Sequence, residues 1–253
     1  RTRLSHDLPR QAEPVLTPPP MTPIRLDRTQ ARAAVLAAQG LHSPRGELVP
    51  TVERSGFLRT LGGVEVYLAA RARVPAMTSK ALETATAERR LQVVPTVRGC
   101  MYLVAARDVP VSLRTADLLG RARLQKEREK AGIKRGELEK LGDVVVETLT
   151  KSGALTTDAL RKALPDDALR SLGDKGKKVG LSSPLPPALR VLEFAGRVER
   201  TLETGRLDSE RYRWRATTKN TLAAADLPDE LAELSPRLAE IFLRAAGIAR
   251  IDD

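Results

Sequence analysis

The stretch that decides the fold class reads TSKALETATAERR (residues 78–90), LQVVP (91–95), TVRG (96–99) and CMYLVA (100–105). Its first part predicts a helix, because Leu82 and Ala85 fall on one helical face and Thr78 is a suitable N-terminal cap. The two apolar runs that follow are typical of β-strands, and the turn between them ends in a glycine. A helix followed by a short hairpin indicates the second half of a winged-helix unit.

The helices expected before this stretch complete one unit. Arg28–Gln39 carries small apolar residues at helical spacing, with Asp27 or Thr29 as its candidate cap. Val64–Val74 predicts a further, Ala-rich helix. Helix, helix, helix and hairpin in this order predict a winged-helix domain over residues 24–112.

The same order recurs in the second half of the chain. A helix with one apolar face comes first, Thr156 is a candidate cap for a short helix, and a third helix is expected to begin near Pro187. The runs Arg197–Leu202 and Arg211–Ala216 then predict a second hairpin. We therefore expect a second winged-helix domain over residues 138–218.

The segments outside these two domains differ in composition. Residues 1–23 are rich in Pro, Arg and Thr, which is typical of a disordered tail. Residues 113–137 are densely charged, which predicts a linker helix that is either solvated or tracks phosphates. Residues 228–253 have an apolar helical face and are expected to begin a third, truncated winged-helix unit. The predicted fold class is mainly helical α+β, with tandem winged helices and small β-hairpins.

Composition argues against several kinds of site. The single cysteine, Cys100, and the two histidines, His6 and His42, argue against a Cys- or His-based metal site, a disulfide framework and a Ser/His/Asp triad. We therefore expect neither a metal nor another cofactor. No apolar run approaches the length of a membrane span, and one cysteine is consistent with a reducing compartment. We expect a cytoplasmic protein with no membrane partner.

Charge favours a polyanionic partner. The formal net charge is +11, and phosphate contacts made by basic side chains release condensed counterions. The charge is uneven: residues 170–219 hold 12 basic and 6 acidic side chains, a net of +6, whereas residues 226–253 hold 3 basic and 7 acidic, a net of −4. A uniformly Arg-rich composition would not by itself produce this contrast, which favours nucleic acid.

The second hairpin is the strongest nucleic-acid candidate. Arg211, Arg213 and Arg215 are spaced two apart and are expected on one strand face, with Tyr212 and Trp214 on the other. Salt bridges within the hairpin are the alternative explanation of these charges. The full set of candidate DNA-binding residues is Arg98, Arg190, Arg197, Arg200, Arg211, Arg213 and Arg215.

The helix in front of that hairpin offers little for reading bases. Winged helices often place their third helix in the major groove. Here that helix would contribute only Arg190 and Glu193 as long polar side chains. We therefore expect phosphate-led, weakly sequence-specific binding. The Gly- and Lys-rich segment Gly173–Gly180 is not a nucleotide-binding loop, because it lacks the Gly-Lys-Ser/Thr ending.

Three segments carry a family resemblance: QARAAVLAAQGL (residues 30–41), YLAARARVP (67–75) and Leu91–Val104, with Arg98-Gly99 in its turn. In this order and spacing, the chain after the tail resembles the AlkZ/YcaQ group of bacterial DNA glycosylases. The resemblance implies tandem winged helices that embrace duplex DNA. It also implies a family activity that excises alkylated purines and unhooks interstrand crosslinks without a metal. The expected partner is double-stranded DNA, including damaged or crosslinked DNA, and the expected state is a monomer.

The family's catalytic signature is Gln, an apolar or small residue, and then Gln or Asp. Aligned on the Tyr67 segment without gaps, this signature falls on Arg59-Thr60-Leu61. Leu61 can neither accept a proton nor hold a water by a hydrogen bond. No glutamine lies between Gln39 and Gln92 that a shifted alignment could use instead.

The resemblance therefore implies a divergent family member that binds duplex DNA with impaired or altered catalysis. Two alternatives stay open. One is an active glycosylase that uses another base, for which Glu65 is the candidate. The other is a winged-helix transcription regulator, which would prefer one operator sequence over damaged DNA.

Overall fold

The structure is a computed structural model, and it describes residues 25–44, 46–60, 62–209, 211–217 and 226–248. It is mainly helical with two small antiparallel sheets, which confirms the expected α+β class. The tail expected over residues 1–23 lies outside the described residues. Within the described part of the chain, no helix is both long and apolar enough to cross a membrane, and no three His, Cys, Asp or Glu side chains cluster as they would around a metal ion.

The first unit is built around a three-stranded sheet in the order β1-β3-β2. Leu103 of the central strand lies opposite Leu58 on one side and opposite Val93 on the other. The side chains of Leu82 and Leu91 are fully buried beside them. The elements of this unit are α1 (Arg28–Ala38), α2 (Leu48–Arg54), β1 (Leu58–Arg59), α3 (Glu65–Arg73), α4 (Ser79–Ala87), β2 (Leu91–Pro95) and β3 (Met101–Ala105).

Helix α5 (Val109–Ala131) joins the first unit to the second. Its first turns bury apolar side chains such as Val111. Further along, α5 lies close to Phe194 of the second unit, because a Cβ added at Gly120 would come within 3.3 Å of that ring. The helix therefore begins and ends earlier than the linker expected over residues 113–137, and its N-terminal part is a packed element of the fold.

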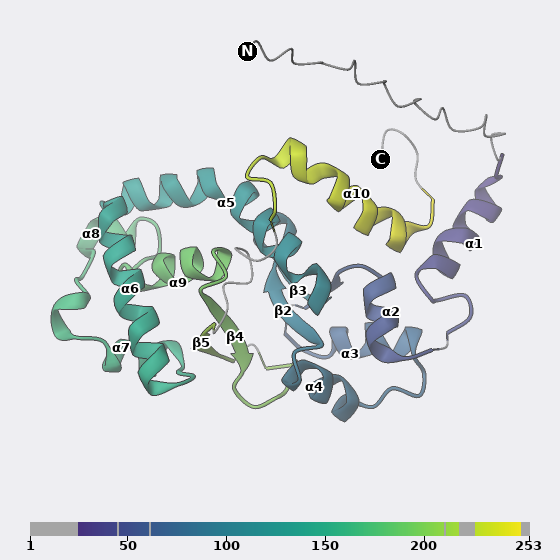
Figure 1. The fold of residues 1–253 in the computed structure, drawn as a ribbon, viewed down its shortest axis with the longest axis horizontal. Coiled ribbons are helices and arrows are strands. Elements are labelled where there is room, and N and C mark those ends of the chain that lie inside the picture. The colour runs from purple at the N-terminus through teal and green to yellow at the C-terminus, as the bar shows by residue number, and fades with distance from the viewer. Residues whose placement is uncertain (1–24, 45, 61, 210, 218–225, 249–253) are drawn as a thin grey trace, which may run out of the picture.

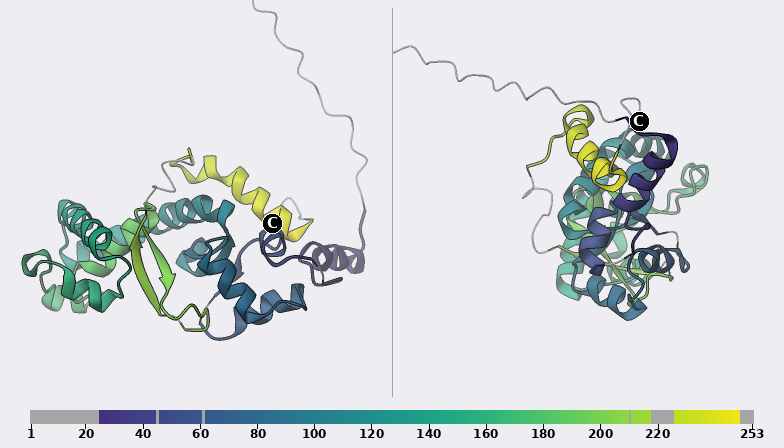
Figure 2. Two further views of the ribbon diagram at one scale, coloured as in Figure 1. Left: turned by 60° about the horizontal axis from the view of Figure 1, so that its bottom comes forward. Right: turned by 90° about the vertical axis from the view of Figure 1, so that its right-hand side faces the viewer.

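The second unit has its own apolar core, in which Val145, Leu160 and Leu185 are fully buried. Helices α6 and α9 approach closely at Gly142, where a Cβ would lie 3.2 Å from Leu192. The elements of this unit are α6 (Arg135–Ser152), α7 (Thr157–Ala163), α8 (Gly173–Lys177), α9 (Leu185–Phe194), β4 (Val198–Leu202) and β5 (Tyr212–Ala216). The β4–β5 hairpin crosses the space between the two units (Figures 1 and 2).

Hydroxyl or carboxylate side chains cap the N-termini of three helices. The hydroxyls of Thr78 and Thr156 each accept a hydrogen bond from the backbone N–H three residues later, at 3.1 and 3.2 Å. At α1 the Asp27 carboxylate accepts hydrogen bonds from the backbone of Thr29 and Gln30 at 2.7 and 2.8 Å. Of the two candidate caps for α1, Asp27 is therefore the cap.

Helix α10 (Leu231–Ala246) packs back onto the first unit, along α5 and against α1 (Figure 1). Leu234 is fully buried there. Arg244 donates to the buried carboxylate of Asp108 at 2.9 Å. The described part of residues 228–253 is thus one helix that covers the first unit.

Candidate nucleic-acid interface

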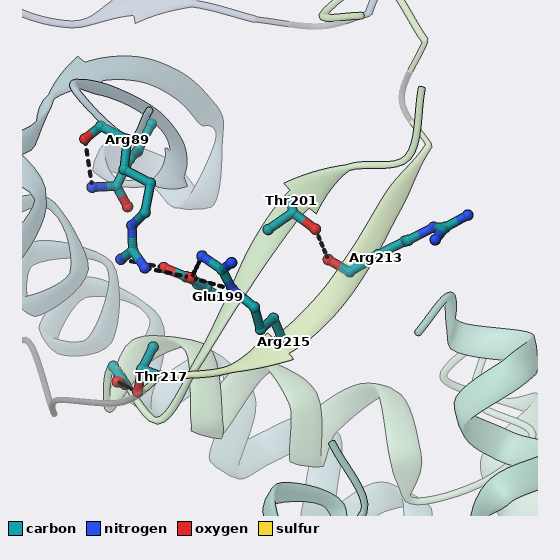
Figure 3. A network of polar contacts seen from close by, with 8 residues as sticks. Arg89, Glu199, Thr201, Arg213, Arg215 and Thr217 are labelled. Atoms are coloured by element: carbon teal, nitrogen blue, oxygen red, sulfur yellow. Dashed lines mark hydrogen bonds and ion pairs between the residues drawn. The ribbon is translucent and has the colours of Figure 1, made fainter. Parts of the chain in front are cut away.

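The β4–β5 hairpin carries the arginines expected to bind DNA. Arg215 donates to the carboxylate of Glu199, its cross-strand neighbour, at 2.9 Å, and Arg89 donates to the same carboxylate at 2.7 Å (Figure 3). One carboxylate thus holds two guanidinium groups, which leaves a net charge of +1. The side chain of Arg213 extends away from this cluster (Figure 3), is 47% exposed and lies 4.0 Å from Glu203.

The two arginines at the ends of the hairpin also differ in whether a carboxylate holds them. Arg211 precedes β5 and is exposed, and no ion pair of its side chain is found among the described residues. Arg197 donates to Asp143 at 2.9 Å. Internal salt bridges thus describe Arg215 and Arg197. Arg213 is exposed and makes only a long ion pair with Glu203, and Arg211 is exposed to solvent.

The opposite face of the hairpin is packed, as the alternation of aromatic residues predicts. Trp214 is 7% exposed, and its indole Nε1 donates to the Thr157 hydroxyl at 3.0 Å. The Arg200 guanidinium lies 4.7 Å from the centre of the Trp214 ring and 5.5 Å from that of Tyr212. It also donates to both oxygens of the Glu193 carboxylate at 2.7 and 2.9 Å.

Glu193 is buried, with 2% of its surface exposed. Burial raises the pKa of this carboxyl, and the positive charge of Arg200 opposes the shift. Because both carboxylate oxygens and two aromatic rings hold the Arg200 guanidinium, this residue stabilises the hairpin and offers little to DNA.

The tip of the hairpin is docked on the first unit. Leu207 is 2% exposed and belongs to the same apolar cluster as Val66 of α3. Its backbone N–H donates to the Tyr67 hydroxyl at 2.9 Å, and the N–H of Gly63 donates to the carbonyl of Asp208 at 3.1 Å. Burial raises the pKa of Tyr67, and the protonated hydroxyl in turn donates to the Glu83 carboxylate at 3.0 Å. The hairpin therefore joins the two units rather than projecting as a free wing.

We expect Leu207→Ala to lower the free energy of unfolding by about 2–3 kcal/mol, because it removes a fully buried side chain and leaves a cavity at the junction of the units. Urea unfolding followed by circular dichroism measures this loss. Leu36→Ala is the matched control: Leu36 is 45% exposed, and its loss is expected to be below about 0.5 kcal/mol. Equal effects of the two substitutions would contradict the docking of the hairpin tip.

The segment aligned with the family signature begins at the last residue of β1. Arg59 ends β1 and is exposed. Thr60 is buried; its N–H donates to the Met101 carbonyl at 3.1 Å, and its hydroxyl has no hydrogen-bond partner among the described residues. Leu61 lies outside the described residues. Glu65 is exposed at the start of α3, so neither it nor Arg59 occupies the buried setting that tunes catalytic side chains.

A cavity of about 410 Å³ brings together arginines from four elements. The charged residues that line it are Arg98, Arg123, Arg190, Glu193 and Arg200. Arg98 lies in the 3₁₀ turn η1 (Val97–Gly99) between β2 and β3. Arg123 of α5 and Arg190 of α9 both donate to Glu127, at 2.8 and 2.9 Å.

The sequence predicts Arg98 and Arg190 as separate DNA contacts and places Arg123 in the charged segment of residues 113–137. No local pattern shows that α5 passes both the first hairpin turn and α9. The density of basic side chains along α5 is the sequence signal that points to Arg123.

Comparisons with known proteins identify a family and a fold. A protein-family model described as DNA glycosylase AlkZ-like matches residues 52–253. The solved structure of Streptomyces sahachiroi DNA glycosylase AlkZ matches with a TM-score of 0.68 and 17% sequence identity, over 90% of this chain and 60% of that chain. At this identity the likeness shows a shared fold. No curated protein sequence matches the chain.

Proposed function

The chain belongs to the DNA glycosylase AlkZ-like family, and from that premise we propose that it binds duplex DNA as a repair-related protein whose base-excising chemistry is impaired or altered. The observation that carries this proposal is the family match over residues 52–253. We propose that the protein is a monomer, that it binds nucleoid DNA in the cytoplasm, and that it needs no metal or other cofactor. Its targets include damaged or crosslinked duplexes.

We interpret the two units as the tandem winged helices expected over residues 24–112 and 138–218. In the first unit, helices α2, α3 and α4 precede the β2–β3 hairpin, and β1 adds an edge strand. In the second, α6, α7 and α9 precede the β4–β5 hairpin, and Leu155 makes an isolated bridge to Trp214 where β1 lies in the first unit. Two such units joined by α5 support a shared role on one duplex.

The burial of α9 supports binding with little sequence preference. This helix stands where a winged helix presents side chains to the major groove. Here Leu185, Leu189 and Leu192 are buried against the neighbouring elements, and Arg190 is held by Glu127. Few side chains are left to read base edges, which favours phosphate contacts and argues against a regulator that selects one operator.

We expect salt-sensitive binding to a random-sequence duplex. If about four phosphates are neutralised, the logarithm of the association constant should fall against the logarithm of salt concentration with a slope of about −3.6. Fluorescence anisotropy of a labelled duplex over a salt series measures this slope. Replacing Arg211 and Arg213 with alanine should flatten it by about one unit per lost contact.

Arg135→Ala is the control for net charge in this experiment. Arg135 is an exposed arginine paired with Glu139 on the surface of α6, with 81% of its side chain exposed. Its removal should leave the slope unchanged within about half a unit. A slope near zero in the wild type, or affinity for only one sequence, would contradict phosphate-led binding.

A further inference from the structure

We propose that the cavity between η1, α5 and α9 is a phosphate pocket that holds one backbone phosphate of the bound duplex, with Arg98 as its principal ligand. This inference rests on the proposed DNA binding and names the place where one phosphate would sit. It differs from the sequence-based expectation, which placed the main contacts on the β4–β5 hairpin.

The first support is the convergence of charge from elements that are distant in the sequence. Arg98, Arg123 and Arg190 line one cavity of about 410 Å³, together with Arg200. Guanidinium groups present donors in a planar fork that matches the oxygens of a phosphate. Such a cavity can enclose an anion on several sides.

The second support is an excess of positive charge that no described carboxylate neutralises. Four arginines line the cavity, and two carboxylates contact them: Glu193 holds Arg200, and Glu127 is shared by Arg123 and Arg190. Four positive and two negative charges leave +2. Burial raises the pKa of Glu127, but hydrogen bonds from its two arginines leave that pKa below the usual value, so its single negative charge persists. The side chain of Arg98 is exposed and makes no ion pair or hydrogen bond with the described residues.

The third support is the backbone of Arg98, which has φ 59° and ψ 14°. This left-handed conformation is unfavourable for a residue with a Cβ, and glycine adopts it freely. Gly99 follows with φ 68°, and a Cβ there would meet nothing within 4 Å. The turn is therefore open to solvent rather than crowded by neighbouring atoms. A glycine at residue 98 would relieve the backbone strain. An arginine held in a strained position at the edge of a basic cavity fits a ligand-binding role.

The test compares the wild type with Arg98→Gly on a random-sequence duplex by fluorescence anisotropy. We expect about a tenfold loss of affinity and a salt slope that is less negative by about one unit, because one phosphate contact is lost. The thermal midpoint should not fall, because glycine accepts the left-handed backbone. A loss of binding without a loss of stability is a result that a structural role for Arg98 would not produce.

Arg89→Gly is the matched control. Arg89 also has a positive φ, 62°, and its guanidinium is engaged by Glu199. The substitution therefore removes the same charge from the same kind of backbone, and we expect less than about a twofold change in DNA affinity. Equal losses in the two variants would overturn the pocket and indicate an effect of net charge alone.

A second readout separates this proposal from the proposed function. Inorganic phosphate should raise the thermal midpoint of the wild type more than that of Arg98→Gly, because it occupies the pocket in the folded state. Normal DNA binding by Arg98→Gly with equal phosphate shifts overturns the pocket and leaves DNA binding in place. If the wild type binds no duplex, the proposed function fails, and the phosphate shifts alone then decide whether the pocket exists.

Discussion

The wild-type chain is expected to release no base above background from a duplex that contains N7-alkylguanine. Hydrolysis of an N-glycosidic bond needs a positioned water and stabilisation of the positive charge that builds on the sugar. General-base assistance typically contributes about 10²–10⁴-fold to such a step. By resemblance, the paired side chains of the family signature do this work, and here the same positions hold Arg59 and Leu61.

Both substitutions act in the same direction. By this alignment, a fixed positive charge at Arg59 would be electrostatically adverse beside a developing cation. By the same alignment, Leu61 would leave the attacking water without its hydrogen-bonding partner. The wild type should therefore fall short of an active family member by at least the factor that base assistance provides.

Base release is measured by strand cleavage at the abasic product, with two sets of variants. In the first, Arg59→Gln is combined with Leu61→Gln to rebuild the family signature. In the second, Glu65→Gln tests whether this carboxylate has taken over as the base. Robust release by the wild type that the double substitution leaves unchanged would contradict impaired catalysis. Its loss in Glu65→Gln would establish the alternative enzyme.

Arg200→Ala is expected to destabilise the fold by about 3–5 kcal/mol, although Arg200 was a candidate DNA contact in the sequence. The substitution leaves the buried carboxylate of Glu193 without its two hydrogen bonds, and unpaired buried charges are strongly unfavourable. It also removes the guanidinium that lies over Trp214 and Tyr212. Chemical unfolding gives the loss directly.

The double variant Glu193→Gln with Arg200→Ala separates charge from packing. Because an unpaired buried carboxyl has a raised pKa in the folded state, the deficit of the single variant should grow as pH rises above the ordinary carboxyl range. It should therefore be larger at pH 7 than at pH 5. The double variant should be more stable than Arg200→Ala at pH 7, and its deficit should not vary in this way. A pH-independent deficit in Arg200→Ala would show that packing alone is lost.

The local elements of this fold could be predicted from the sequence because their signals are short-range. Thr78 and Thr156 cap their helices through the backbone three residues later. The register of the second hairpin places Trp214 on the packed side, as alternation along a strand requires. Helix caps and strand alternation depend on neighbours within a few residues, so one sequence is enough to find them.

The long-range contacts could not be predicted in this way. The N–H of Leu207 meets the Tyr67 hydroxyl across 140 residues, and this contact docks the hairpin on the first unit. Arg98, Arg123 and Arg190 share a cavity only because α5 crosses between the first hairpin turn and α9. A charge pattern shows that a segment is basic, but the tertiary fold decides which arginines are neutralised by a carboxylate and which face solvent.

The proposed function is tested most directly by measuring binding and base release together in one sample. A labelled duplex with a single N7-alkylguanine and its unmodified counterpart are each titrated with wild-type protein at low and at moderate salt. Anisotropy reports binding, and strand cleavage at abasic sites in the same samples reports chemistry. We expect saturable binding of both duplexes that weakens steeply with salt, with no cleavage above the protein-free level. Base release from the bound alkylated duplex, or no binding of either duplex at low salt, would contradict this result.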